Sequence, residues 1–166
     1  MKNVKTVNFP KESKCRDFIE KVDFEDAYQV KLRDSKMQME DIYFGLFAYM
    51  PKWIGKLLWL RNKAVGVFGL DTGKNDEELV KENIKVGKKI GLFTVYDIQP
   101  NEIIAGENDK HLNFRVSILK QNTEVIVITL VQYNNTFGKV YMNLIMPFHK
   151  LVVKSMLNSA VKNNRI

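Results

Sequence analysis

The sequence has few of the residues on which many functions depend. Its single cysteine, Cys15, excludes a framework of internal disulfides. The two histidines, His111 and His149, together with that cysteine are too few for an ordinary zinc site. No uncharged apolar run reaches the roughly 18 residues that a membrane-spanning helix needs. We therefore expect no metal, no cofactor and no membrane span.

The motifs of phosphate binding and of covalent catalysis are missing too. The nine glycines form neither G-x-G-x-x-G nor G-x-x-x-x-G-K-[ST], and no G-x-S-x-G occurs. Cys15 lies between two cations, Lys14 and Arg16, which would favour its thiolate. Its place in a polar N-terminal stretch indicates an incidental thiol, so we expect no catalytic residues. The first 20 residues have no apolar core, which predicts a cytoplasmic protein without a secretory signal.

Basic charge is unevenly distributed along the chain. Lys and Arg number 26 against 19 Asp and Glu, a net charge of +7, and no acid follows Glu124. A second acid-free stretch, 52–63, contains the tryptophans and cations of a segment lying on an anionic membrane surface. The cations equally suit a solvated surface or an acidic ligand. Nucleic acid is disfavoured as a partner, because no recognition motif accompanies the charge.

Length and composition are those of one ordinary globular domain, 1–166, which is 45% hydrophobic and 27% charged. Residues 22–32 alternate between apolar and polar side chains, which predicts a half-buried strand. Further strands are predicted, with short turns between them, at 91–98, 102–106, 112–119, 124–133 and 139–146. Turns this short join antiparallel neighbours, because a parallel pair needs a crossover of about a dozen residues or more.

Helices are predicted in two places. Apolar residues at helical spacing over 38–50 predict one short helix, and Pro51 ends it and begins a second. Residues 147–164 predict a long C-terminal helix with Pro147 in its first turn. The polar residues 1–21 predict an irregular lead-in. The expected fold is α+β, with a curved antiparallel sheet wrapped on the C-terminal helix and two short helices after the first strand.

Several motifs carry a resemblance to a known family. They are GENDKHLNFRVSIL (106–119) and TEVIVITLVQYNNTFGKVYMNLIMPFHKLVVKSML (123–157), with WLRNKAVGVFGL (59–70) upstream. These segments resemble the bacterial family catalogued as domain of unknown function 2867. That family is similar to the helix-grip folds of the Bet v 1 and START-like (SRPBCC) superfamily. The resemblance implies seven strands around a hydrophobic pocket, whereas the residues predict six. Either a seventh strand lies within 64–70 or 84–90, or the sheet is reduced to six strands.

The resemblance assigns no activity, and three hypotheses follow from it and from the residues. The preferred one is non-catalytic binding of a small hydrophobic or amphipathic molecule between the sheet and the C-terminal helix. Its candidate ligand-binding residues are Tyr43, Phe47, Trp53, Trp59, Arg115, Tyr141, Met146 and His149. The short helices would form a lid over the open end of the pocket.

The second hypothesis is a lyase- or isomerase-like enzyme, which requires Arg115, Tyr141 and His149 to converge on one cavity. The nearby cluster of Glu107, Asp109 and His111 suits acid–base chemistry or a set of salt bridges at a hairpin turn. The third hypothesis is an accessory module for a separate oxidoreductase, because some members of the family are attached to a nucleotide-binding Rossmann domain. The sequence also leaves a homodimer open.

Overall fold

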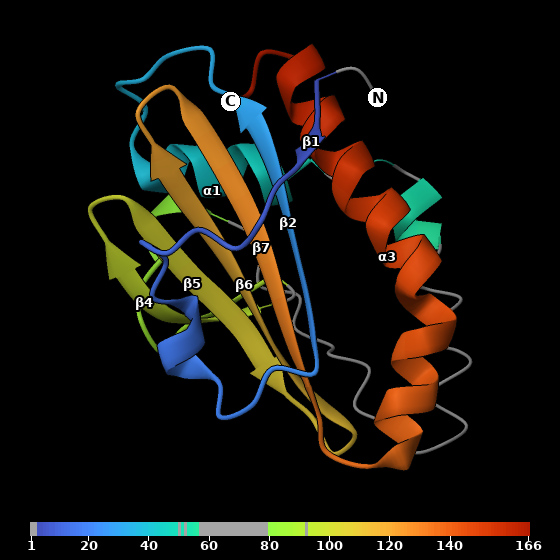
Figure 1. Ribbon diagram of the computed structural model, residues 1–166. Coiled ribbons are helices and arrows are strands. Elements are labelled where there is room, and N and C mark those ends of the chain that lie inside the picture. Colours follow the sequence, from blue (N-terminus) through green and yellow to red (C-terminus); the bar gives the residue numbers. More distant parts are fainter. Residues whose placement is uncertain (1–2, 50, 52, 57–79, 92) are drawn as a thin grey trace.

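The chain forms an open antiparallel sheet with helices on one side (Figure 1). The computed structural model describes all residues except 1–2, 50, 52, 57–79 and 92. Within that part the sheet has seven strands: β1 (Lys5–Thr6), β2 (Phe24–Lys31), β3 (Lys89–Ile90), β4 (Phe93–Gln99), β5 (Glu102–Asn108), β6 (Leu112–Gln121) and β7 (Glu124–Tyr133). Their order is β1-β2-β7-β6-β5-β4-β3, and every neighbouring pair is antiparallel.

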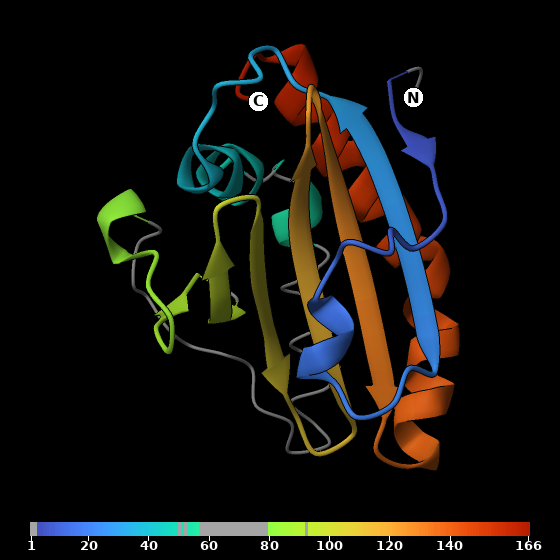
Figure 2. The ribbon, with the colours of Figure 1, turned by 60° about the vertical axis from the view of Figure 1, so that its left-hand side comes forward.

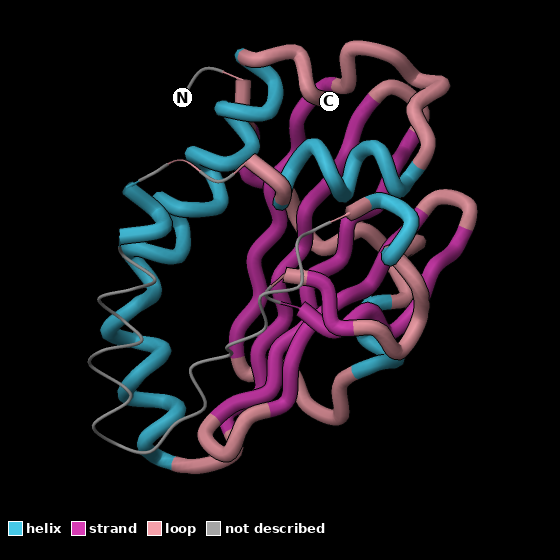
Figure 3. The backbone as a smooth tube through the Cα atoms, turned by 180° about the vertical axis from the view of Figure 1, so that it is seen from behind, coloured by secondary structure: helices cyan, strands magenta, loops and turns pink. Residues whose placement is uncertain are grey.

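Two α-helices lie on the same side of this sheet, as the view from behind shows (Figure 3). They are α1 (Met39–Phe47) and α3 (Thr136–Lys162), and residues 53–56 are helical as well. Two short 3₁₀ helices, η1 (Cys15–Phe18) and η2 (Lys81–Asn83), lie outside the sheet. The structure is therefore α+β with an antiparallel sheet and a long C-terminal helix, as the sequence predicts.

The core lies between the sheet and the two α-helices. Alternate residues of each strand point to this side, so Val116 and Ile118 of β6 meet Tyr28 of β2 in one buried cluster. Leu157 and Ala160 of α3 complete the cluster from the helix side. The C-terminal half of α3 is thereby fixed to the sheet by burial of apolar surface.

The N-terminal segment is more ordered than the predicted irregular lead-in over 1–21. It contributes β1 at the edge of the sheet, and η1 lies across the face opposite α3 (Figure 2). Cys15 of η1 packs there with Leu119 and Ile128, in a second buried cluster. The polar composition of 1–21 hid this role, because few apolar side chains are enough to cover the face.

The predicted strand at 139–146 is wrong, because these residues belong to α3. The helix begins at Thr136, where the side chain of Asn135 accepts a hydrogen bond from the Gly138 N–H at 2.9 Å. Pro147 therefore lies inside α3 and not in its first turn, which corrects the predicted 147–164. A proline inside a helix removes one backbone donor, which the 27-residue helix accommodates.

Two periodicities coexist over 139–146, and this explains the error. Apolar residues occur at every second position from Val140 to Met146, which is typical of a strand. Phe137, Leu144 and Phe148 also follow the three- and four-residue spacing of a helix. The capping side chain of Asn135 decides between the two patterns.

The sheet has seven strands although the strand predicted at 139–146 does not form. β3 occurs at Lys89–Ile90, inside the stretch 84–90 where a seventh strand was expected. β1 was not predicted, because two residues are too few to show a periodicity. The other strands agree with their predicted ranges to within about two residues at each end, the usual uncertainty of element ends.

Candidate functional site

Four aromatic rings form a row on the helix-facing side of the sheet, and we call these four residues the aromatic row. Tyr43 and Phe47 of α1 have ring centroids 4.8 Å apart. Phe47 contacts Phe93 of β4 at 5.3 Å, and Phe93 contacts Phe114 of β6 at 5.6 Å, both edge to face. Tyr43 is buried, whereas the three phenylalanines are only partly buried. The row therefore leads from the surface into the core.

The four rings of the aromatic row are positioned by α1 and by two strands of the sheet. Tyr43 and Phe47 are four residues apart on α1, so both project from one side of that helix. Phe93 and Phe114 come from β4 and β6, which flank β5 on either side. Phe114 pairs in register with Glu107 of β5, whose carboxylate lies 2.8 Å from the ammonium of Lys89. The ion pair of Glu107 and Lys89 therefore lies beside Phe114, at the partly exposed end of the aromatic row.

The hydroxyl of Tyr43 stands out at the inner end of the aromatic row. The residue is 1% exposed, and its oxygen has no hydrogen-bond partner among the described residues. Burial raises the pKa of its phenol above the ordinary value, so the group stays neutral and keeps its proton. Leaving such a donor unsatisfied in a core costs roughly 1–3 kcal/mol. A ligand that accepted this hydrogen bond would recover that cost.

Of the predicted ligand-binding residues, Tyr43 and Phe47 thus lie together in the aromatic row. Trp53 is 38% exposed and does not belong to the row. Trp59 lies outside the described residues, as does most of 52–63, for which a membrane contact was predicted. Phe93 and Phe114 were missed, because in sequence they look like ordinary core residues of two strands.

His149 joins α3 to β2. Its Nε2 lies 3.2 Å from a carboxylate oxygen of Asp26, and its ring meets Phe24 edge to face at 5.9 Å. Burial, and then the nearby Asp26, raise the pKa of Tyr28 on the same strand. Met146, one turn earlier on α3, is half-buried. The sequence contained a signal for this pair, since Asp26 interrupts the apolar side of the strand at 22–32.

Tyr141 belongs to a different cluster at the start of α3. Its ring lies 5.0 Å from that of His111 and stacks on Phe137 at 6.3 Å. Nδ1 of His111 lies 3.3 Å from the carboxylate of Asp109. Of the predicted cluster, Asp109 and His111 therefore lie together beside the first turns of α3, whereas Glu107 pairs with Lys89.

Arg115 lies on the opposite face of the sheet. Its guanidinium stacks over Tyr96 at 3.9 Å and donates hydrogen bonds to the Phe114 carbonyl at 2.7 Å and to Oδ1 of Asn108 at 2.9 Å. Desolvation lowers the pKa of this guanidinium from its ordinary value. The sheet separates Arg115 from His149, so the convergence that the enzyme hypothesis requires is not present.

The face of the sheet on which Arg115 lies also contains a buried carboxylate, Glu102, that was not predicted from the sequence. Glu102 is buried and accepts hydrogen bonds from the Ser13 hydroxyl at 2.5 Å, the Lys14 N–H at 2.9 Å and the Ser117 hydroxyl. Next to it, burial and then the charge of Glu102 raise the pKa of the Cys15 thiol to about 12. The thiol is therefore protonated at neutral pH, because burial outweighs the cation Arg16 that was expected to favour thiolate.

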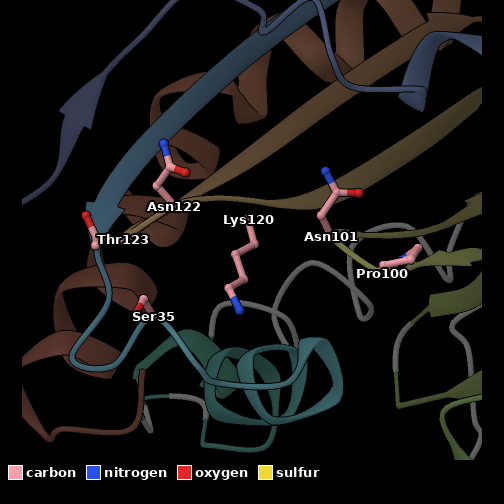
Figure 4. A pocket seen from close by; sticks show the side chains of 6 residues that line it. All are labelled: Ser35, Pro100, Asn101, Lys120, Asn122 and Thr123. Atoms are coloured by element: carbon pink, nitrogen blue, oxygen red, sulfur yellow. The ribbon is translucent and has the colours of Figure 1, made fainter.

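Two hollows in the surface lie away from all these residues. One has a volume of about 500 Å³ and is lined by residues at one end of the sheet: Ser35, Pro100, Asn101, Lys120, Asn122 and Thr123 (Figure 4). The ammonium of Lys120 already donates to the Met37 carbonyl at 2.7 Å. The other, of about 450 Å³, adjoins α1 and Arg165, which bonds to the Gly45 and Tyr49 carbonyls. Both hollows are open and are lined by polar and apolar groups in similar measure, and neither is lined by a predicted site residue.

Neither a metal site nor a membrane-spanning helix is found in the described part of the chain. It contains no group of three or more His, Cys, Asp or Glu side chains placed to hold a metal ion. None of its helices combines the length and the apolar character needed to cross a bilayer. The partly exposed aromatic row is thus the strongest candidate for a binding site.

The class of this protein is defined by its fold, an open antiparallel sheet with a long C-terminal helix, and the aromatic row lies between that sheet and α1. The family described as "Protein of unknown function (DUF2867)" matches residues 18–156. The chain belongs to that family, as the sequence motifs indicated. No curated protein and no solved structure matches the chain.

Proposed function

We propose that the protein binds a small hydrophobic or amphipathic molecule at the aromatic row, without catalysing a reaction on it. The observation that carries this proposal is the unpartnered hydroxyl of Tyr43 at the buried end of three partly exposed phenylalanine rings. Binding sites for small molecules combine an apolar wall with a few polar groups that fix orientation. The aromatic row supplies the wall, and Tyr43 supplies one such polar group.

The rings determine what kind of ligand suits the site. Phe47, Phe93 and Phe114 offer edges and faces to an alkyl chain or a flat ring, and each buried Å² of apolar surface contributes roughly 25 cal/mol. The Tyr43 hydroxyl favours a molecule that places an acceptor oxygen at its inner end. The sheet-plus-helix arrangement supports assigning the fold to the helix-grip type, in which such a site lies between sheet and C-terminal helix.

The proposal is tested with a fluorescent amphiphile, 8-anilinonaphthalene-1-sulfonate, titrated into the folded protein. Saturable binding of one probe molecule is expected, and Phe93→Ala weakens it about fivefold or more, because it removes the central ring of the row. Phe18→Ala is the matched control. Phe18 is also partly buried and also packs edge to face, on Tyr96, but on the other side of the sheet. An equal loss of probe affinity in Phe93→Ala and Phe18→Ala, or probe binding that does not saturate, would contradict the proposal.

A further inference from the structure

One side of α3 exposes a continuous line of large apolar residues, which we call the α3 stripe. Its members are Phe137, Val140, Leu144, Phe148 and Leu151. Their three- and four-residue spacing places them on one side of the helix. Their exposed fractions run from 41% for Phe137 to 71% for Leu144. Met142, Leu157 and Ala160, which are buried, face the sheet instead.

Isolated exposed apolar residues are ordinary, but a contiguous line is not. A soluble chain rarely exposes large apolar residues side by side unless they meet a partner. The α3 stripe extends over about four turns of a 27-residue helix that runs along one side of the molecule (Figure 3). This length suits an extended partner better than a small ligand.

The charges on α3 indicate what that partner is. The helix carries Lys139, Lys150, Lys154 and Lys162 and no acid, and no acid occurs anywhere after Glu124. None of these four lysines takes part in a salt bridge among the described residues. Lys154 lies over the ring of Tyr28 at 5.1 Å, whereas Lys139, Lys150 and Lys162 are exposed and can meet an anionic partner outside the chain.

We propose that the α3 stripe docks on an anionic lipid bilayer, with α3 lying in the plane of the interface. An amphipathic helix binds such a surface by burying its apolar side below the head groups while lysines contact the anionic lipids. A second copy of the chain fits less well, since pairing two α3 helices would bring like charges together with no acid to balance them. The proposal concerns the outer side of α3 and is independent of ligand binding at the aromatic row.

Sedimentation with vesicles tests the proposal on the full chain. The wild type is expected to partition at least tenfold more strongly into vesicles of phosphatidylcholine with phosphatidylglycerol than into phosphatidylcholine alone. The double variant Leu144→Glu/Phe148→Glu is expected to lose at least tenfold of that partition. Val86→Glu is the matched control, because Val86 is an exposed apolar residue, 59% exposed, before β3 and away from α3.

A second variant separates charge from apolar contact. Lys139→Glu/Lys150→Glu alters two exposed lysines and leaves the stripe intact, and we expect it to abolish the preference for anionic vesicles. Equal partition into both vesicle types, or none, overturns the proposal. So does a loss of folding stability in Leu144→Glu/Phe148→Glu well beyond that of Val86→Glu, since the stripe would then be covered by the chain itself. A wild-type dimer that the same variant dissociates would assign the stripe to a second copy.

Discussion

The two faces of the sheet are covered in different ways. The face opposite α3 is covered by the N-terminal segment, which Glu102 holds through hydrogen bonds from Ser13, Lys14 and Ser117. Its apolar residues pack in a cluster around Cys15, which is fully buried. On the helix-facing side, the aromatic row remains partly exposed and ends at an unpartnered hydroxyl.

The difference separates a structural face from a candidate binding face. Proteins satisfy nearly all buried polar groups, so each exception needs an explanation. The Glu102 carboxylate has three hydrogen-bond donors, and Arg115 on the same face, although its Nε has no partner, donates through both of its Nη atoms. The Tyr43 hydroxyl has no hydrogen-bond partner among the described residues, so we expect a ligand to bind on the helix-facing side of the sheet.

The largest effect is expected from Glu102→Ala. This change strands the hydroxyls of Ser13 and Ser117 and the N–H of Lys14, and we expect a loss of about 3–5 kcal/mol in the free energy of unfolding. Urea denaturation measures the loss. Alkylation of Cys15 by iodoacetamide should accelerate as well, because the segment that buries the thiol is released.

Glu102→Gln is the control for that prediction. Its amide oxygen still accepts hydrogen bonds, so the loss of stability should be clearly smaller than for Glu102→Ala. Equal losses in the two variants would show that the three donors do not hold the N-terminal segment.

A smaller effect is expected from His149→Ala on the other face. It removes the partner of the Asp26 carboxylate and the edge-to-face contact with Phe24, at a cost of about 1–2 kcal/mol. Lys150→Ala, at the exposed neighbouring position, should change stability by less than about 0.5 kcal/mol. A double-mutant cycle with Asp26→Asn that shows no coupling energy would refute the pairing.

The smallest effect on the free energy of unfolding is expected from Tyr43→Phe, and it is a gain in stability. Tyr43→Phe deletes an unsatisfied hydroxyl, so the ligand-free protein should become more stable by about 1 kcal/mol. Affinity for 8-anilinonaphthalene-1-sulfonate, or for a natural ligand, should fall if the hydroxyl contacts it. Tyr96→Phe on the opposite face is the matched control for binding. A Tyr43→Phe protein that is less stable without ligand would mean that the hydroxyl already has a partner.

The sheet could be predicted from sequence because its strands carry strong local signals. β6 and β7 are both ten residues long and are separated by a short turn, and β7 is rich in β-branched residues, so pattern and turn length agree. The start of α3 could not be predicted in the same way, because Val140 to Met146 suit either periodicity. The contact at the helix start, Asn135 to the Gly138 N–H, is a local N-cap that the alternation of apolar residues obscured.

The candidate site could be predicted only in part. Tyr43 and Phe47 were found because aromatic residues crowd one short helix, but their neighbours Phe93 and Phe114 come from strands distant in sequence. The sequence suggested Arg115 as a neighbour of His149 only if the polar side of its strand lined the cavity. Side-chain alternation on β6 places Arg115 on the far face, and sequence could not show which face the helices cover.

Native mass spectrometry of protein purified without denaturant tests the binding proposal most directly. The account predicts a reproducible added mass on the 19.3 kDa chain, lost on denaturation and absent from Phe93→Ala but present in Phe18→Ala. Incubation with a total lipid extract should restore the added mass to stripped wild-type protein. A bare chain mass, before and after that incubation, would contradict ligand binding at the aromatic row.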